Sequence, residues 1–474
     1  MTTGSRIFRN FAALSVGQVV SMTCSLIVAV ILARVLGPAS YGILGFGAAL
    51  LSYLGLVVNM GLDVHGVRVI SHDPEQTGAL VGFVLIFRVI ISAALFAILL
   101  GGLDYINQPE MVKIVVLIQG CGLFFVALNL DFVFQAMQQM KVMAARQIAA
   151  SLMALIAVFI LITSPADLYK AAGIPAAVNM VTAVVVLIIF LNSSGVRIEI
   201  RRGFSMARDL LKSSVPVALM AALNTIYVSL DIVILQFMRP QDEVGLYVVA
   251  SRVLALAVVP AGILHSVFLP ALSSVFDDDE RRYGIARKYA RTIILLGAAV
   301  GVGGTILAVP VVDVLFGEAF AGAGISSIIL MVSAGMVYLT LAYGTPLLGW
   351  RRDRAYFKVL VVGAALNVVL NFALIPFYGI EGAAVATLIT QSTVCLSLLL
   401  IVRSAFAINF SDLVLKSIGL AILCGMPTYF VPQIYDLPTL VDLTLSAVTF
   451  GSLFCLLAVR LQFVTVTEIK GLFS

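Results

Sequence analysis

Charged residues are scarce in this chain. Asp, Glu, Lys and Arg make up 11% of its 474 residues, whereas a soluble domain carries about a quarter. Hydrophobic residues reach 61%, and the mean hydropathy is +1.12. This balance excludes an ordinary soluble protein and predicts an integral membrane protein with many spans. The apolar runs are too long for barrel strands and do not alternate, so the fold class we predict is all-α.

Residues that carry chemistry are also few. No Lys follows a Gly, so the chain lacks a Walker A phosphate loop, and it contains neither G-x-S-x-G nor H-E-x-x-H. The three His residues have no metal-ligand spacing, and the five Cys residues show no C-x-x-C pair. We therefore predict no catalytic set, no metal and no cofactor, which indicates a protein that is not an enzyme.

The apolar runs predict about fourteen membrane spans. The first run continues to Leu36, which is too long for a cleavable signal peptide. The expected spans are 11–36, 41–61, 78–101, 112–136, 147–163, 171–191, 214–237, 244–268, 292–316, 320–349, 359–377, 380–402, 417–434 and 440–459.

The basic residues predict the orientation. If the N-terminus is cytoplasmic, 23 of the 29 Lys and Arg residues fall on inner segments. The outer side holds only Arg34, Lys113, Lys170 and Arg239, while Arg88 and Arg252 lie inside spans. Both termini are thus expected in the cytoplasm of a multi-pass protein of the cell membrane. The positive charge needs no nucleic-acid partner to explain it.

Two echoes in the sequence indicate an internal repeat. Ile31-Leu32 and Gly42-Ile43 match Ile234-Leu235 and Gly245-Leu246 at an offset of 203, and 173–177 echoes 379–383 at an offset of 206. An even number of spans separates such segments, so the repeats have the same orientation. We predict an N-terminal lobe at 1–191 and a C-terminal lobe at 214–402. A cytoplasmic linker at 192–213 with an amphipathic helix joins them, and 403–474 adds spans 13 and 14.

Polar side chains inside the spans are the candidate site residues, because a charge at mid-bilayer costs about 2.5–3.5 kcal/mol and usually faces a cavity or a partner. Arg binds phosphate or pyrophosphate oxygens in a bidentate manner and keeps its charge. The alternatives are that Arg88 or Arg252 pairs with Asp131 or Asp231, that the Asn residues join helices, and that Arg34 reaches the surface. The candidates for a substrate cavity are Arg88, Arg252, Arg34, Asn224, Asn367 and Asn371.

Three passages carry a resemblance to a known family. Leu32–Gly42, Asp231–Tyr247 and Asn367–Thr387 resemble the polysaccharide transporter family of lipid-linked oligosaccharide, or O-antigen-type, flippases. That family belongs to the multidrug/oligosaccharidyl-lipid/polysaccharide exporter superfamily. The resemblance implies two six-helix lobes in a V-shaped alternating-access transporter, with an appended helix pair. By analogy it also implies coupling to a proton or sodium ion, for which Asp231 is the candidate carboxylate, with Asp131 as a further ion-coupling or charge-pair candidate.

The implied function is flipping of an undecaprenyl-pyrophosphate-linked oligosaccharide from the inner to the outer leaflet, for surface polysaccharide such as O-antigen, capsule or exopolysaccharide. Glycan polymerase and chain-length proteins are the implied partners. Three alternatives stay open. A peptidoglycan lipid-precursor flippase also has fourteen spans and a basic cavity. A multidrug cation antiporter usually has twelve spans and an acidic cavity. A membrane glycan polymerase is disfavoured because no long outer loop is present.

Overall fold

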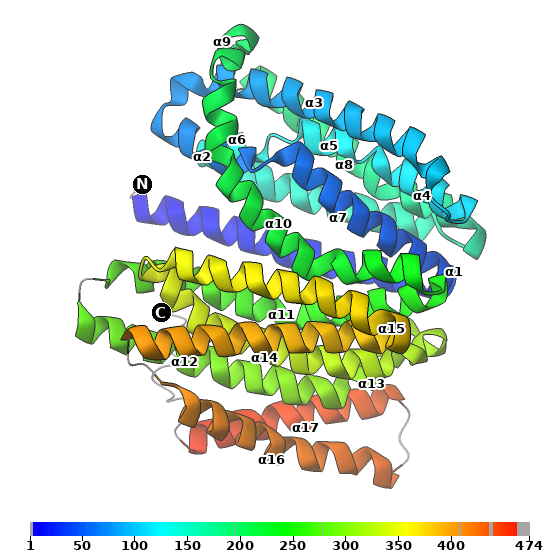
Figure 1. Ribbon diagram of the computed structural model, residues 1–474, viewed down its shortest axis with the longest axis vertical. Helices are drawn as coiled ribbons and strands as arrows, with labels where there is room; N and C mark the ends of the chain where they lie inside the picture. The colour runs from blue at the N-terminus through cyan, green and yellow to red at the C-terminus, as the bar shows by residue number, and fades with distance from the viewer. Residues whose placement is uncertain (1–2, 194, 277, 407–408, 436–438, 462–474) are drawn as a thin grey trace. The chain divides into compact units, whose positions relative to one another are not determined.

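The computed structural model describes residues 3–193, 195–276, 278–406, 409–435 and 439–461. Throughout these ranges the chain is almost entirely helical and contains no strand (Figure 1). The helices cluster into two compact units, Met1–Gly245 and Leu246–Ser474. The units are described separately below.

The N-terminal unit is built from helices that form two apolar clusters. One cluster joins the later part of α1 to α4, α7 and α8, and the other joins α2, α3, α6 and α8 to the start of α10. Its helices are α1 (Thr3–Asn59), α2 (Leu62–His72), α3 (Thr77–Gly102), α4 (Glu110–Gly120), α5 (Leu123–Leu128), α6 (Asp131–Ala136), α7 (Met140–Leu161), α8 (Leu168–Ser193), α9 (Ile200–Ser205) and α10 (Ala207–Met238).

The C-terminal unit begins at Leu246, within α11, and its last two helices, α16 and α17, pack against each other (Figure 1). A further apolar cluster joins α12 to α16 and α17. The helices are α11 (Gln241–Ser274), α12 (Asp279–Ala298), α13 (Gly304–Phe316), α14 (Gly324–Gly349), α15 (Asp353–Phe406), α16 (Ser411–Tyr435) and α17 (Thr439–Arg460), with one π-helical turn, η4 (Ala299–Gly303), before α13.

Twelve helical segments of the described chain are long and apolar enough to cross a membrane. Two helices, α1 and α15, have 57 and 54 residues, which is more than twice the roughly 20 that one crossing needs. Each is divided by a glycine with positive φ, Gly37 at 75° and Gly379 at 56°, a conformation that glycine adopts without strain. If both helices cross twice, the crossings number fourteen. That count stays a prediction.

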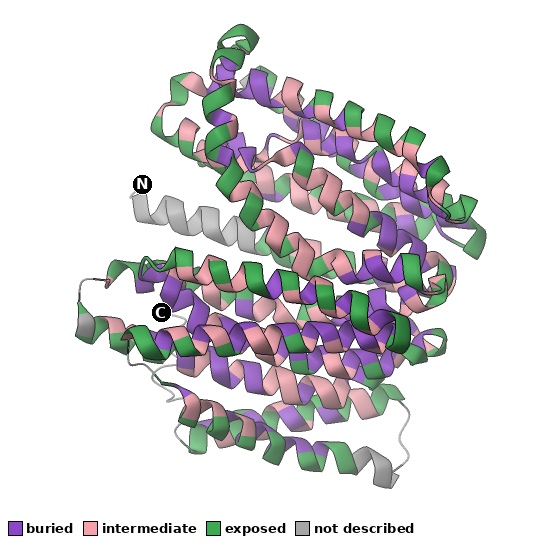
Figure 2. Ribbon diagram, viewed as in Figure 1, coloured by how far each residue is buried: buried purple, intermediate pink, exposed green. Residues whose placement is uncertain are grey.

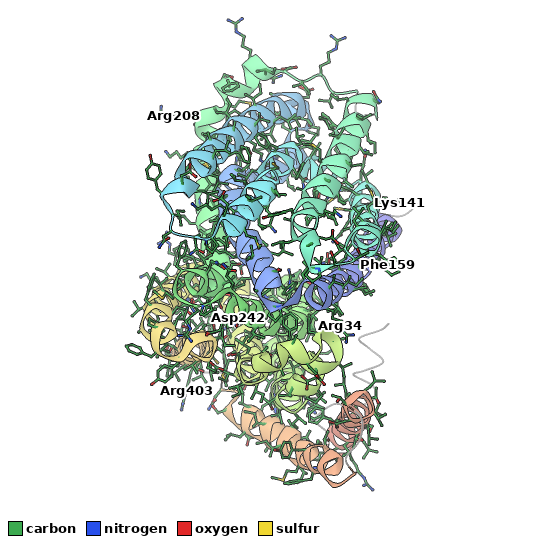
Figure 3. The ribbon with its side chains drawn as sticks, turned by 90° about the vertical axis from the view of Figure 1, so that its right-hand side faces the viewer. Arg34, Lys141, Phe159, Arg208, Asp242 and Arg403 are labelled. Atoms are coloured by element: carbon green, nitrogen blue, oxygen red, sulfur yellow. The ribbon has the colours of Figure 1, made fainter. Side chains whose placement is uncertain are left out.

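The surface of the helices is apolar over wide areas, as expected for a protein in contact with lipid. Figure 2 shows exposed positions along the outer faces of many helices, and large hydrophobic side chains are common among them. Phe159 on α7, labelled in Figure 3, is 75% exposed, and Phe377 on α15 is 81% exposed. Because exposure of this kind is costly in water, these faces are suited to the bilayer.

The fourth expected span, 112–136, is interrupted twice. It consists of α4, α5 and α6, with breaks after Gly120 and at Asn129-Leu130. Broken helices leave backbone groups unpaired, and within a membrane these need partners from the protein. Ser92 donates to the carbonyl oxygen of Leu123 at 3.0 Å, and Arg88 donates to that of Asn129 at 3.3 Å. The breaks are therefore held by polar side chains of α3.

The first sequence echo coincides with a helix crossing. A Cβ atom added to Gly42 would lie 2.6 Å from the amide nitrogen of Gly245, and one added to Gly245 would overlap the carbonyl of Pro38. Gln241 and Gly245, in the first turns of α11, correspond to Pro38 and Gly42 at the offset of 203. The matching glycines of the predicted repeats, Gly42 and Gly245, thus lie against each other, and each approaches the backbone of the other helix.

The segment 192–213 contains α9 and the first turns of α10, and it packs on the start of α3. The Glu199 amide donates to the carbonyl oxygen of Gly78 at 3.1 Å, and a Cβ on Gly203 would overlap the carbonyl of Ala79. Ile200 and Phe204 remain 49% and 46% exposed, as a surface helix requires. That the segment 192–213 is a cytoplasmic linker stays a prediction.

Candidate functional site

Burial divides the predicted site residues into two groups. Arg34 on α1, Asn224 on α10 and Arg252 on α11 are exposed, although each lies in a candidate membrane-spanning helix. Arg88 and Asn371 are fully buried, and Asn367 is nearly so. A guanidinium group exposed to lipid is costly, so a charged side chain on a spanning helix usually faces water, a cavity or a partner. Arg34, Asn224 and Arg252 each have exposed surface.

Arg88 lies at the centre of a polar cluster in the N-terminal unit. Its Nη2 donates to Asp63 Oδ1 at 2.7 Å and to Asn59 Oδ1 at 3.2 Å, while Nη1 bonds the Asn129 carbonyl. Its guanidinium also lies 5.7 Å from the centre of the Phe132 ring. The side chain has no exposed surface, whereas the Asp63 side chain is 38% exposed. Arg88 therefore joins α3 to α1, α2 and the broken fourth span.

Asp63 was not predicted from the sequence as the partner of Arg88. The partners considered there were Asp131 and Asp231. Asp131 instead accepts two hydrogen bonds from Arg146, from Nε at 2.8 Å and from Nη2. Its amide donates to Asn129 Oδ1 at 2.7 Å. Asn129 thus contacts both ion pairs, through its carbonyl to Arg88 and through its side chain to Asp131. One visible signal was the Asn129-Leu130-Asp131 sequence, in which an Asn precedes a helix start.

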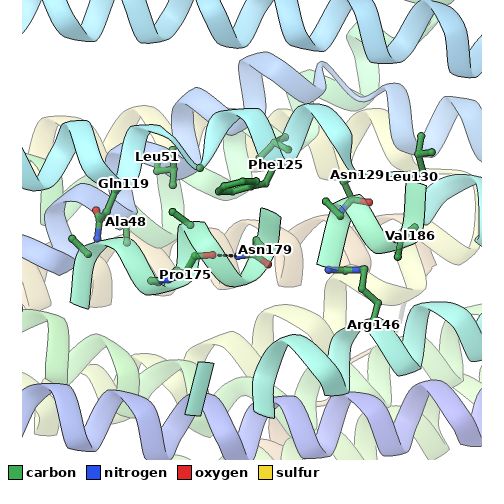
Figure 4. Close-up of a pocket in the computed structure, with 15 residues that line it drawn as sticks. Ala48, Leu51, Gln119, Phe125, Asn129, Leu130, Arg146, Pro175, Asn179 and Val186 are labelled. Atoms are coloured by element: carbon green, nitrogen blue, oxygen red, sulfur yellow. Dashed lines mark hydrogen bonds between the residues drawn. The ribbon is translucent and has the colours of Figure 1, made fainter. Parts of the chain in front are cut away.

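A cavity adjoins this cluster within the N-terminal unit (Figure 4). It encloses about 880 Å³ of space unfilled by atoms, part of it open to the outside. Arg146 and Asn129 lie towards one end and Gln119 lies towards the other, with Asn179 and Pro175 between them. Asn179 donates to the Pro175 carbonyl at 2.9 Å, four residues back along α8. The cavity is mostly apolar. Its polar lining consists of the Arg146 guanidinium group and the side-chain amides of Gln119, Asn129 and Asn179.

The remaining polar candidates lie in helix interiors. Asp231 is 7% exposed, and its Oδ1 accepts from the amide of Ile232 at 2.9 Å. Asn371 donates to the carbonyl and the Oδ1 of Asn367, at 2.9 and 3.1 Å. This pair therefore bonds along its own helix, α15. The predicted ion-coupling role of Asp231 and the substrate roles of the two asparagines stay predictions.

An apolar groove lies in the C-terminal unit, between α12, α13, α14 and α17. It encloses about 1400 Å³ of space unfilled by atoms, part of it open to the outside. Phe450 and Phe454 of α17 line it, while Lys288 and Arg291 of α12 supply two cations. An apolar wall with cations beside it can accept a chain-like lipid that carries an anionic group. Sequence reasoning did not identify this groove, because it depends on the packing of α17.

Across the described parts of the chain, no three or more His, Cys, Asp or Glu side chains come together in a way that could hold a metal ion. The clusters that do occur pair arginines with single carboxylates and amides, which suits structural ion pairs and anion binding rather than metal coordination.

Long apolar helices, breaks held by buried polar side chains and exposed cations within spans define a class, the multi-span membrane transporters. The chain belongs to the polysaccharide biosynthesis protein family, whose model matches residues 7–276. This result confirms the family resemblance drawn from the three sequence passages. It also confirms that the chain is a transporter rather than an enzyme, because its curated relatives are named as flippases and transporters.

Those relatives match over different shares of their length. The putative O-antigen transporter of Escherichia coli strain K12 is 23% identical over 84% of this chain and 96% of its own. The probable flippase AglR of Haloferax volcanii is 33% identical, but the match spans only 35% of this chain and 36% of AglR. The capsular polysaccharide biosynthesis protein CapF of Staphylococcus aureus is 19% identical over 82% of this chain and 97% of its own.

Solved structures share the fold. The lipid II flippase MurJ, in an inward closed conformation, matches with a TM-score of 0.76 at 15% identity, over 94% of this chain and 99% of that one. An inward-facing multidrug resistance transporter of the MATE family of the MOP superfamily matches with a TM-score of 0.71 at 16% identity, over 84% and 98%. The predicted fold class, an all-α membrane transporter, is confirmed.

Proposed function

We propose that this chain flips an undecaprenyl-pyrophosphate-linked oligosaccharide from the inner to the outer leaflet of the bacterial cytoplasmic membrane, for the synthesis of a surface polysaccharide. The observation that carries the proposal is the exposure of Arg34 and Arg252 on helices that are apolar enough to cross a membrane. A guanidinium group binds phosphate oxygens in a bidentate manner and stays charged at any physiological pH. Asn224, also exposed, can hydrogen-bond sugar hydroxyl groups.

The C-terminal groove is the observation that favours a lipid tail in the proposed substrate. Its apolar wall suits an isoprenoid tail, and Lys288 and Arg291 suit the pyrophosphate that joins the tail to the glycan. A multidrug cation would gain nothing from these two cations. A peptidoglycan lipid precursor carries the same kind of tail and pyrophosphate, so it remains the alternative cargo, and the assay below compares the two.

The proposal includes the membrane setting predicted from the sequence. Both termini lie in the cytoplasm, two related lobes at 1–191 and 214–402 alternate in access, and spans 13 and 14 are appended. A proton or sodium gradient drives the cycle, with Asp231 as the candidate carboxylate. Glycan polymerase and chain-length proteins take up the delivered substrate.

Replacing Arg252 tests the anion-binding part of the proposal. Arg252→Ala is expected to lower transport of a lipid-linked oligosaccharide by about tenfold to a hundredfold, because a hydrogen bond to a charged group contributes about 1.5–3 kcal/mol. Arg252→Lys should retain part of the activity, since an ammonium group keeps the charge and loses the bidentate geometry. The measurement is uptake into proteoliposomes of known orientation, with an O-antigen-type substrate and a peptidoglycan precursor compared side by side.

Arg403→Ala is the matched control, because Arg403 is also an exposed arginine but lies in the last turn of α15. Its transport should equal that of the wild type. Unchanged transport in Arg252→Ala would show that Arg252 does not contact the substrate. Faster transport of the peptidoglycan precursor than of the oligosaccharide would select the alternative cargo.

Filling the groove tests the site proposed for the lipid tail. Gly451 lines the groove, and a Cβ atom placed on it meets no atom within 4 Å, so Gly451→Phe introduces a ring into the groove with no clash at its Cβ. Transport is expected to fall at least tenfold while the amount of folded protein is unchanged. Gly419→Phe on α16 is the control, since a Cβ atom on Gly419 also meets no atom within 4 Å and Gly419 does not line the groove. Equal transport by the two variants would contradict the groove assignment.

A further inference from the structure

Three helices of the C-terminal unit meet at a chain of hydrogen-bonding side chains. Nδ1 of His265 on α11 lies 2.8 Å from Oγ1 of Thr345 on α14. The same Oγ1 lies 2.8 Å from the hydroxyl of Tyr289 on α12. That hydroxyl also lies 3.3 Å from the carbonyl oxygen of Leu341, one turn before Thr345. Thr345 and Tyr289 are fully buried, whereas the His265 ring is partly exposed.

The chain can satisfy both charge states of the imidazole ring. When the ring is neutral with its proton on Nε2, Tyr289 donates to Thr345 and Thr345 donates to Nδ1. When the ring is protonated, Nδ1 donates to Thr345, Thr345 donates to the Tyr289 oxygen, and Tyr289 donates to the Leu341 carbonyl. Every hydroxyl proton has an acceptor in both arrangements. Protonation therefore reverses the direction of the hydrogen bonds between α11, α14 and α12 by turning two hydroxyl groups.

Two phenols adjoin the chain, Tyr289 itself and Tyr356 of α15, whose ring packs on Gly344. A phenol ordinarily keeps its proton at neutral pH. The cations of α12 have other environments. Arg282 stacks on Trp350 and Phe406.

Of the four other basic groups of α12, Lys288 and Arg291 line the apolar groove, and Arg281 and Arg287 are exposed. Among the residues that the structure describes, no charged side chain forms an ion pair or hydrogen bond with His265.

His265 also lies far along its helix. It follows Gln241, the first residue of α11, by 24 positions, which is roughly 36 Å at about 1.5 Å per residue. The hydrocarbon core of a bilayer is about 30 Å thick. If α11 begins at the outer boundary of that core, the ring reaches the inner boundary, where water can deliver and remove a proton.

We infer that His265 is a proton-binding site of the C-terminal unit, reached from the cytoplasmic side, and that Thr345 and Tyr289 relay its charge state to α14 and α12. The proton comes from water and returns to water, and no other bond changes. Resting on the proposed function, the inference adds that occupancy of this site is linked to the transport cycle. His265 acts on the substrate only through the helices, so it is a positioning residue.

Nuclear magnetic resonance of labelled histidine in nanodiscs tests the site itself. The chain contains only two other histidines, so His65→Asn and His72→Asn leave the signal of His265 alone. The ring is expected to titrate and to carry its proton on Nε2 when neutral. Thr345→Val should shift the midpoint and mix the two tautomers. A neutral ring protonated on Nδ1, or a midpoint and tautomer unchanged by Thr345→Val, would overturn the assignment.

Transport at a series of pH values tests the linkage. His265→Asn is expected to abolish the change in transport rate between about pH 5.5 and 8, because the amide bonds Thr345 without titrating. His65→Asn and His72→Asn should keep the wild-type pH profile. A wild-type profile in His265→Asn would overturn the linkage. If the wild-type protein itself moves no lipid-linked glycan, the proposed function fails, and the magnetic resonance result still decides the proton site.

Discussion

Arg88→Ala is expected to destabilise the N-terminal unit and to abolish transport as a consequence. The substitution removes the donor to Asp63, Asn59 and the Asn129 carbonyl, and it leaves a cavity where a fully buried side chain lay. Breaking a buried ion pair costs about 3–5 kcal/mol. The lower part of that range applies here, because the Asp63 side chain is 38% exposed and keeps some water. The measurement is the fraction of protein that stays monodisperse after heating, as determined by size-exclusion chromatography.

A double-mutant cycle separates this structural effect from a direct contact with substrate. If Arg88 acts through Asp63, Arg88→Met combined with Asp63→Asn should cost less stability than the sum of the single changes. Arg146→Ala is the matched comparison. Its pair with Asp131 is about a fifth exposed on both sides, whereas the Arg88 side chain is fully buried, so we expect a smaller loss than for Arg88→Ala. Wild-type thermal stability in Arg88→Ala, together with lost transport, would show instead that Arg88 binds the substrate in another conformation.

Arg88 also shows what the sequence could and could not predict. Its depth in an apolar run indicated that the charge must be satisfied, which is correct. The identity of the partner depended on the rotation of α3 about its axis and on the bend after Asn59, and hydropathy gives neither. Asp63 falls just after the second predicted span, 41–61, so nothing in its local sequence distinguished it from a solvated loop carboxylate.

The broken fourth span was missed for a related reason. Residues 112–136 have the apolar composition of one continuous span, and Cys121-Gly122 and Asn129 are weak helix breakers. Tertiary hydrogen bonds from Ser92 and Arg88 compensate the backbone groups that the breaks release. Such compensation arises between helices and leaves little trace in a local pattern. The hairpin 367–387, in contrast, was predictable, because Gly379 marks its turn and small residues begin the next helix.

The internal repeat stays a prediction, but the structure gives a reason for the matching residues at the offset of 203. Pro38 and Gly42 lie against Gln241 and Gly245, which are their equivalents at the offset of 203. A side chain on either glycine would meet backbone atoms of the other helix, so both copies need glycine for the same reason. The similarity therefore reflects a reciprocal packing constraint at this crossing, in addition to the common helix pattern of the two halves.

Gly245→Val is expected to separate this crossing. Its Cβ would overlap the Pro38 carbonyl, which is backbone and cannot rotate away, so the first turn of α11 must move from α1. Overpacking of this kind costs about 1–3 kcal/mol and sometimes more. We expect about 3 kcal/mol and a loss of transport of at least tenfold, because the crossing joins equivalent segments of the two repeats. Thermal stability and proteoliposome transport measure the two effects.

Gly262→Val is the control on the same helix, because a Cβ there meets no atom within 4 Å, and its effect should stay within about 0.5 kcal/mol. Gly42→Val should reproduce the defect of Gly245→Val, since its Cβ would lie 2.6 Å from the Gly245 amide nitrogen. The double variant should lose less than the sum of the two, because helices already separated by one side chain accommodate the second at lower cost. Full additivity, or a Gly245→Val variant as stable as Gly262→Val, would show that the crossing is not tightly packed and that the two glycines act independently.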